Sequence, residues 1–335
     1  MPWNAALVGP GLLNPGERNA GGLWRRACDR LLGEGLPPNR YYGHDRLLRH
    51  YARVRLPYRL PGLLQHGWML GTGIHSDISR HGDEERARTY FVWNERNRAE
   101  SHALGYANAV AIGAPLLYLD AESLPSPAND DRSLLLFPLH AAEKARLVGG
   151  TLELYTEYLD SLAAILARFE PVTVCLYWME HEDPRIRELF RRRGIPVTTL
   201  GHRDTTPRFL HRFADLVGRH AYVSSNHYST AVFYSLFLGR RTFVYGPHFD
   251  LTVLPAERRT GTVQEILARD YPELLWDRFD GRNHRWIGER ELGAEFKRTP
   301  GELRDLFDWR LSRLLATLSR RARRFVLRRL GTSAP

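Results

Sequence analysis

The stretch that most constrains the fold covers residues 221–247. It holds an apolar segment, a polar loop, a segment of helical length, a glycine and a second apolar segment. Ala221–Ser225 and Thr242–Tyr245 are short, apolar and partly β-branched, which predicts two buried strands. Ser229 suits a helix N-cap, and Gly239 suits the residue that ends a helix. Strand, helix and strand in this order predict a βαβ unit with parallel strands.

The polar loop Asn226–Thr230 follows the first of these strands. It therefore lies at the carboxyl end of a parallel strand, which is the edge where open α/β sheets bind ligands. The start of a helix at this edge offers unpaired N–H groups and the positive end of the helix dipole, and both favour phosphate. Ser229 and Thr230 act either as simple caps or also as hydroxyl contacts to a ligand phosphate, and the sequence leaves both roles open.

The same alternation extends upstream of this unit. Five expected strands alternate with four expected helices, which predicts a doubly wound parallel sheet in a C-terminal domain spanning residues 133–290. We place the strands at 134–137, 172–178, 196–200, 221–225 and 242–245, and the helices at 152–169, 184–193, 207–217 and 229–238.

The N-terminal half reads as a second, smaller α/β domain over residues 1–125. Residues 120–132 are rich in Ser, Pro, Asn and Asp, as surface linkers are, and we place the domain boundary there. In this half we expect strands at 62–66, 89–93 and 115–119 and a helix at 100–112.

Charge is concentrated at the C-terminus. Nine arginines against two aspartates between residues 304 and 330 account for +7 of the net charge of +10, so the body of the chain is not expected to bind nucleic acid. Residues 300–335 read as a basic amphipathic helix. Its segment Leu303–Leu330 either contacts an anionic membrane or packs across both domains. No apolar run reaches the roughly 18 residues of a membrane span and no signal peptide is recognisable, which favours a cytoplasmic protein at the inner face of the membrane.

A histidine follows each of the five predicted C-terminal strands. Histidine donates to phosphate oxygens and, when protonated, offsets the charge of a leaving group. A metal site is the rival explanation, but the close histidine or cysteine pairs of dedicated metal sites are missing, and some of these residues are expected simply at the surface. The five are His140, His181, His202, His227 and His248.

The N-terminal half offers a candidate proton acceptor. His66 stands at the end of a predicted strand, before a glycine that permits a tight turn, and a neutral imidazole there takes a proton from an attacking hydroxyl, unless it is only a partly buried structural residue. Glu95, after the next strand, is the competing base, and Asp77 is a third candidate, for the base or for acceptor contact. Trp68 and Trp93 either stack on a sugar of the acceptor or belong to the core.

These features together resemble a known family. The segment SSNHYSTAVFYSLFLGRRTFVYGP, in which Ser229 and Thr230 open a helix that ends in Leu-Gly before a new strand, is similar to the donor-phosphate site of GT-B glycosyltransferases. More narrowly, it resembles bacterial capsule-synthesis and sialyl/Kdo-transferase-like enzymes. His181 and Pro184 stand where that family has its His-Pro motif, with two residues inserted between them.

The resemblance implies two Rossmann-like domains facing across a cleft. It further implies an inverting, metal-independent transfer of a sugar from a nucleotide-sugar donor, with a CMP-sugar favoured, to a surface-polysaccharide or glycolipid acceptor, without a cofactor. His66 or Glu95 would be the base. Alternatives are a nucleotide-sugar epimerase, a glycerol-phosphate-type transferase and a non-catalytic nucleotide-binding assembly protein, while the missing G-x-G-x-x-G argues against a dehydrogenase. The implied donor contacts are His140, His181, His202, Asn226, His227, Ser229 and Thr230.

Overall fold

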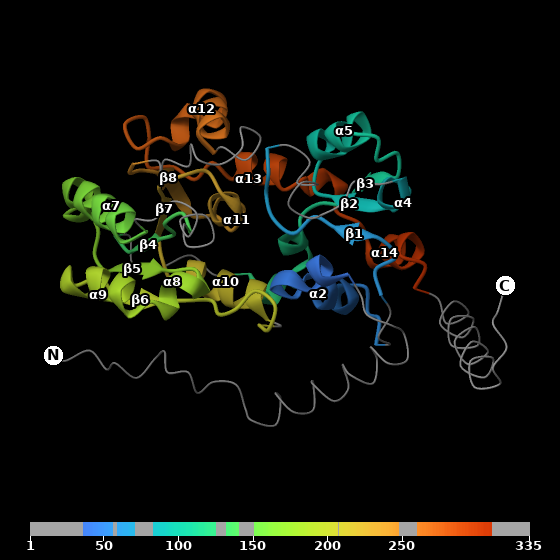
Figure 1. The fold of residues 1–335 in the computed structure, drawn as a ribbon, viewed down its shortest axis with the longest axis horizontal. Helices are drawn as coiled ribbons and strands as arrows, with labels where there is room; N and C mark the ends of the chain where they lie inside the picture. Colours follow the sequence, from blue (N-terminus) through green and yellow to red (C-terminus); the bar gives the residue numbers. More distant parts are fainter. Residues whose placement is uncertain are drawn as a thin grey trace.

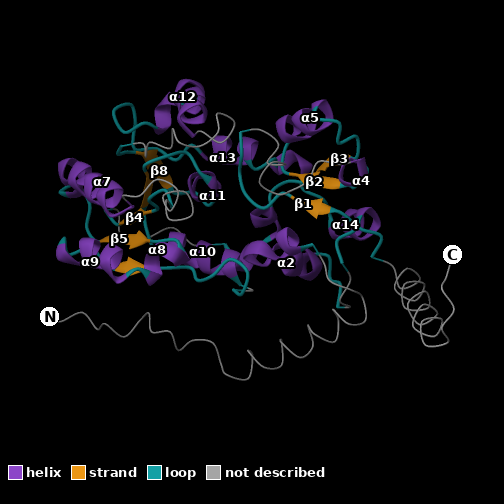
Figure 2. Cartoon of the chain, in the orientation of Figure 1, coloured by secondary structure: helices purple, strands orange, loops and turns teal. Residues whose placement is uncertain are grey.

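The chain folds into two separate parallel β-sheets with helices around them (Figures 1 and 2). It is therefore a mixed α/β protein, as the sequence predicts. The computed structural model describes residues 36–55, 59–70, 83–124, 132–140, 151–206, 208–247 and 260–309.

The larger sheet has the doubly wound order β6-β5-β4-β7-β8, and every pair is parallel. The chain runs outward from β4 through β5 to β6, then returns to the other side of β4 as β7 and β8. The direction of winding thus reverses between β4 and β7, and crevices at such switch points bind ligands in open α/β sheets. The strands are β4 (Leu134–Leu136), β5 (Val172–Cys175), β6 (Val197–Thr198), β7 (Tyr222–Ser225) and β8 (Arg241–Val244), which confirms all five predicted strands.

Helices cover both faces of this sheet. Apolar residues of α7 (Thr151–Leu166) and α9 (Pro184–Arg192) pack on one face, and those of α10 (Phe209–Gly218) and α11 (Thr230–Phe237) on the other. Two details differ from prediction. The segment after β5 turns into a short helix, α8 (Trp178–Glu182), and α10 begins at Phe209 rather than at residue 207.

The smaller sheet has the order β1-β2-β3, again parallel, formed by β1 (Leu63–Leu64), β2 (Tyr90–Val92) and β3 (Ala109–Ala111). The third strand is not at 115–119 as predicted, because Pro115 starts a 3-10 helix, η2 (Pro115–Tyr118). The helix predicted at 100–112 begins earlier, since Asn94 caps it through a hydrogen bond from the Asn97 amide. The accompanying helices are α2 (His44–Tyr51), α4 (Asp83–Arg86) and α5 (Glu95–Ala103), and η1 (Pro37–Gly43) precedes α2.

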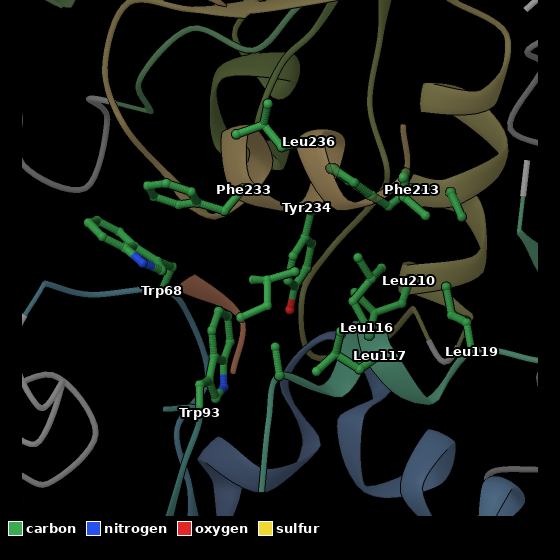
Figure 3. Packing of buried hydrophobic residues seen from close by; sticks show 14 of the residues in the cluster. Trp68, Trp93, Leu116, Leu117, Leu119, Leu210, Phe213, Phe233, Tyr234 and Leu236 are labelled. Atoms are coloured by element: carbon green, nitrogen blue, oxygen red, sulfur yellow. The ribbon is translucent and has the colours of Figure 1, made fainter. Parts of the chain in front are cut away.

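After β8 the chain forms α12 (Thr260–Asp270), η5 (Pro272–Leu274), α13 (Arg285–Glu291), η6 (Ala294–Phe296) and α14 (Pro300–Leu306). A further 3-10 helix, η3 (Ala121–Ser123), lies between the two sheets in sequence. Helix α13 packs on α11, whereas α14 returns to the smaller sheet, where the Phe307 ring lies 4.8 Å from Phe91. One apolar core therefore runs through both halves of the molecule (Figure 3).

The C-terminal helix differs from its prediction. It ends at Leu306, and Leu303, Phe307 and Trp309 are buried in the core, so this part cannot present them to a membrane. Residues 310–335, which carry most of the predicted membrane contact, lie outside the described residues. Within the described part of the chain, no helix is long and apolar enough to cross a membrane.

Candidate functional site

A hydrogen bond joins the loop after β1 to the start of α11. The Trp68 backbone N–H donates to the Thr230 hydroxyl oxygen at 2.9 Å. The Trp68 ring packs on Phe233, one turn further along the helix, at 4.5 Å (Figure 3). A Cβ on Gly67 would lie 3.4 Å from the same hydroxyl oxygen, which is an ordinary van der Waals contact, so the two segments pack closely here. The segment that carries His66, the predicted base, is thereby held at the N-terminus of α11.

The switch point of the larger sheet is held together by Asn226. Its amide oxygen accepts from the Leu139 N–H at 2.7 Å, and its amide nitrogen donates to the Pro247 carbonyl at 2.9 Å. The side chain is completely buried. Asn226 thus joins the loops that follow β4, β7 and β8 instead of facing a ligand, which differs from its predicted contact with donor phosphate.

Ser229 and Thr230 divide the roles that the sequence left open. Ser229 occupies the N-cap position of α11 and is half-buried, but its side chain makes no capping hydrogen bond within the described residues. Thr230 uses its hydroxyl oxygen across the interface with Trp68, and the hydroxyl proton is still available for donation. The simple capping role is therefore not what either hydroxyl performs here.

Two of the predicted histidines lie in an aromatic row along the carboxyl edge of the larger sheet. The His140 ring lies 4.7 Å from that of Tyr177, Tyr177 lies 5.9 Å from Trp178, and Trp178 lies 4.2 Å from His202. All four residues are half-buried. His202 also accepts a hydrogen bond from the Asp204 amide at its Nδ1 atom. Such a row offers flat apolar surface together with imidazole groups.

The other histidines have different surroundings. His181 lies in α8, where burial and the nearby Arg187 guanidinium lower its pKa, so it is neutral at pH 7. His227 is half-buried and follows Asn226 directly, and its backbone N–H donates to the Ser225 hydroxyl oxygen at 3.3 Å. His248 lies outside the described residues.

The surroundings of His66 include a cation. Its ring meets the Tyr41 ring of η1 edge-on at 5.7 Å, and the Arg203 guanidinium lies over the same Tyr41 ring, 4.7 Å from its centroid. The Tyr42 N–H donates to the Arg203 carbonyl at 2.8 Å. The loop after β6 therefore reaches η1 next to His66, and Arg203 brings positive charge to this part of the interface.

The remaining predicted residues of the N-terminal half lie elsewhere. The Glu95 side chain is exposed and pairs with Arg98 at 2.8 Å within α5. Trp93 has no exposed surface, donates its indole N–H to the Gln65 carbonyl at 3.1 Å and stacks on Tyr234, so it cannot touch an acceptor in this conformation. Asp77 lies outside the described residues.

Sequence reasoning missed several residues of the interface. Arg203 directly follows the predicted His202, and this proximity was the available signal. Glu291, which is 1% exposed and bonded to Trp68 and Tyr271 of the two halves, stands in a polar region that gives no sign of burial. Among the described residues, no group of three or more His, Cys, Asp or Glu side chains is arranged to hold a metal ion.

Comparisons with known proteins leave the family open. No protein-family model and no curated protein sequence matches the chain. Among solved structures, a variant of the wall teichoic acid polymerase TagF is similar over 67% of this chain and 55% of its own, with 12% sequence identity and a TM-score of 0.35. The chain thus spans about half the length of that polymerase. No conclusion about activity follows from a likeness at this level.

Proposed function

We propose that this protein is a glycosyltransferase that moves a sugar from a nucleotide-sugar donor to a glycan or glycolipid acceptor of a bacterial surface polysaccharide. The observation that carries the proposal is the hydrogen bond from Trp68 to Thr230. It holds the segment that carries His66, our candidate base, beside a helix N-terminus at the ligand-binding edge of a doubly wound sheet. The base lies in the N-terminal half of the chain and the phosphate site in the C-terminal half, and this bond connects the two segments.

The proposed reaction is a single displacement without a metal ion. The acceptor hydroxyl attacks the anomeric carbon while His66 takes its proton, and the bond from that carbon to the phosphate oxygen breaks with its electron pair leaving on the phosphate. The free N–H groups of α11 and the hydroxyls of Ser229 and Thr230 stabilise the charge that develops on the phosphate. Attack opposite the leaving group inverts the anomeric configuration.

His66 is favoured over Glu95 as the base. Contacts with Trp68 and Thr230 connect the His66 segment to α11, whereas the Glu95 carboxylate is exposed and paired with Arg98. Within the donor site, the aromatic row of His140, Tyr177, Trp178 and His202 is our candidate platform for the nucleoside. The tail beyond residue 310 remains our candidate for contact with an anionic membrane surface.

A panel of CMP, CDP, UDP, GDP and ADP in thermal-shift experiments tests the donor site. A rise of several degrees with one nucleotide names the donor class, and no shift with any of them contradicts the proposal. With that donor, His66→Ala should lower turnover about 100-fold or more while the nucleotide shift stays unchanged. The matched variant Glu95→Gln should retain turnover, and the opposite ranking would make Glu95 the base.

One observation favours a second function. The Thr230 hydroxyl oxygen, which the proposal places at the donor phosphate, already accepts from Trp68. A protein that binds a nucleotide only to hold its two halves together would use the residue in this way. Such an assembly protein would show the nucleotide shift without transfer to any acceptor, and His66→Ala would then change nothing measurable.

A further inference from the structure

The structure contains a buried carboxylate where its two halves meet. Glu291, the last residue of α13, is 1% exposed. Its Oε2 atom accepts from the Trp68 indole at 2.8 Å and from Arg96 Nη2 at 2.5 Å, and its Oε1 atom accepts from Arg96 Nη1 at 3.2 Å and from the Tyr271 hydroxyl. A carboxylate buried to this extent is retained only where charge pairing and hydrogen bonds compensate its lost hydration, and here both are present.

Glu291 stabilises the charged form of Arg96. Burial disfavours the charged Arg96, but the hydrogen bond and the charge of Glu291 outweigh burial and raise the pKa of Arg96. The neighbouring Tyr271 has its pKa raised by burial and by the same carboxylate, so it remains a neutral donor. A bidentate guanidinium–carboxylate pair also fixes orientation, because its two bonds are parallel.

Glu291 acts on the loop after β1 by two routes. It holds the Trp68 indole directly, and it orients Arg96, whose Nε atom donates to the Leu70 carbonyl at 2.7 Å. Other side chains hold the backbone between these points. Gln65 donates to the Gly67 carbonyl at 2.9 Å and Asn97 to the Met69 carbonyl at 3.2 Å, while Thr230 accepts from the Trp68 amide at 2.9 Å.

We propose that Glu291 is a positioning residue that holds the His66-Gly67-Trp68 segment against the N-terminus of α11 from across the interface. It touches neither reacting group. Its effect on turnover rests on the proposed function, whereas its effect on the segment does not. Catalytic geometry tolerates little displacement, since a shift of about 1 Å costs up to about 100-fold in rate.

Three variants of the full chain test this. Glu291→Gln removes the charge that pairs with Arg96, and Trp68→Phe removes only the indole donor while the ring can still pack on Phe233. Glu289→Gln is the matched control on the same helix, because its carboxylate forms an exposed pair with Arg285. The first readout is hydrogen–deuterium exchange of the amides of residues 66–70, with residues 151–166 of α7 as the internal reference. The second readout is kinetic, with kcat and the KM for the donor determined separately.

We expect amides of residues 66–70 to exchange at least about tenfold faster in Glu291→Gln and in Trp68→Phe, with α7 unchanged and with Glu289→Gln like the wild type. Turnover should fall about 10- to 100-fold in the two variants, with the donor KM changed less than about twofold. Unchanged exchange at 66–70, or equal acceleration in α7, overturns the proposal. If Glu291→Gln does not fold, the amide exchange of Trp68→Phe at residues 66–70 tests the positioning role alone. If no donor supports transfer in the wild type, the proposed function fails while the exchange result still decides the positioning role.

Discussion

Gly288 tests the helix contact on which the interface is built. It lies in α13, three residues before Glu291, and faces the backbone of α11. A Cβ at this position would lie 2.6 Å from the Phe237 nitrogen and 2.9 Å from the Phe233 carbonyl oxygen. Because both atoms belong to the backbone of a helix, neither can rotate away. Gly288→Ala therefore requires α13 to withdraw from α11 by about 1 Å to reach an ordinary contact distance.

The cost follows from two opposing terms. Overpacking of a rigid contact costs about 1–3 kcal/mol, and we take the upper end because backbone must move. Alanine in place of glycine in a helix gives back up to about 1 kcal/mol. The expected net loss of unfolding free energy is about 2 kcal/mol. Gly301→Ala is the matched control, since Gly301 also lies in a helix, α14, and the nearest atom to its added Cβ is 3.9 Å away.

Urea unfolding followed by circular dichroism measures both variants. Gly301→Ala should match or exceed the wild type by up to about 1 kcal/mol, which separates the two variants by about 3 kcal/mol. The difference isolates the steric term, since the gain in helix propensity is largely shared. Gly288→Ala should also speed amide exchange at residues 66–70, because Glu291 moves with α13. Equal stability of Gly288→Ala and Gly301→Ala would refute the close packing of α13 on α11.

Two further predictions concern pH and the tail. Burial and the nearby His66 lower the pKa of His44 to about 3, against about 6.5 for an exposed histidine, so the unfolded chain binds the proton more readily. Through this group, the unfolding free energy should therefore fall by about 1.4 kcal/mol for each pH unit below pH 6.5. In urea unfolding at several pH values, His44→Gln should show a smaller dependence of the unfolding free energy on pH than the wild type. Equal slopes for the variant and the wild type would contradict the prediction. Deleting Arg320–Pro335 should abolish sedimentation with anionic vesicles, and unchanged sedimentation counts against membrane contact.

The larger sheet could be predicted because local residue types mark the ends of its strands and helices. Pro184 starts α9 at its first position, where a missing N–H costs nothing. Gly194 and Gly239 follow α9 and α11 with φ of +72° and +82°, the left-handed conformation that glycine adopts most readily. Each apolar segment between such signals had one length-compatible assignment, and the order of alternation then implied the parallel sheet.

The smaller sheet could not be predicted as well, because its strands are only two or three residues long. The segment PLLYL at 115–119 is more apolar than the true third strand, Ala109–Ala111, and a fully buried run looks the same as strand or helix. The decisive signal was Pro115, which suits the first position of a helix. Tyr118 then reaches back to the Ile112 carbonyl, a contact that periodicity cannot reveal.

Candidate site residues can be named from the sequence, but their arrangement cannot. His66 and Thr230 are marked by their positions after expected strands, yet the bond that unites their segments spans 162 residues of sequence. Asn226 and Trp93 lie at equally plausible positions, and only burial shows that they are internal. Glu291 carries no local mark, since a glutamate in a short charged helix is expected at the surface.

Thr230 links the two functions proposed for the interface, and its replacement separates them. If the donor phosphate binds at the start of α11, Thr230 donates its hydroxyl proton to the phosphate while its oxygen holds Trp68, so donor binding and the position of His66 are coupled. Thr230→Val, which keeps the shape, should then weaken nucleotide binding about 10- to 100-fold, because one lost hydrogen bond to a charged group is worth about 1.5–3 kcal/mol. It should also speed exchange of the Trp68 amide, because that amide loses its acceptor. Thr230→Ser keeps the hydroxyl and should preserve both properties. Faster exchange with unchanged nucleotide binding would show that Thr230 serves only the interface, and the donor phosphate would have to be sought elsewhere on the sheet edge.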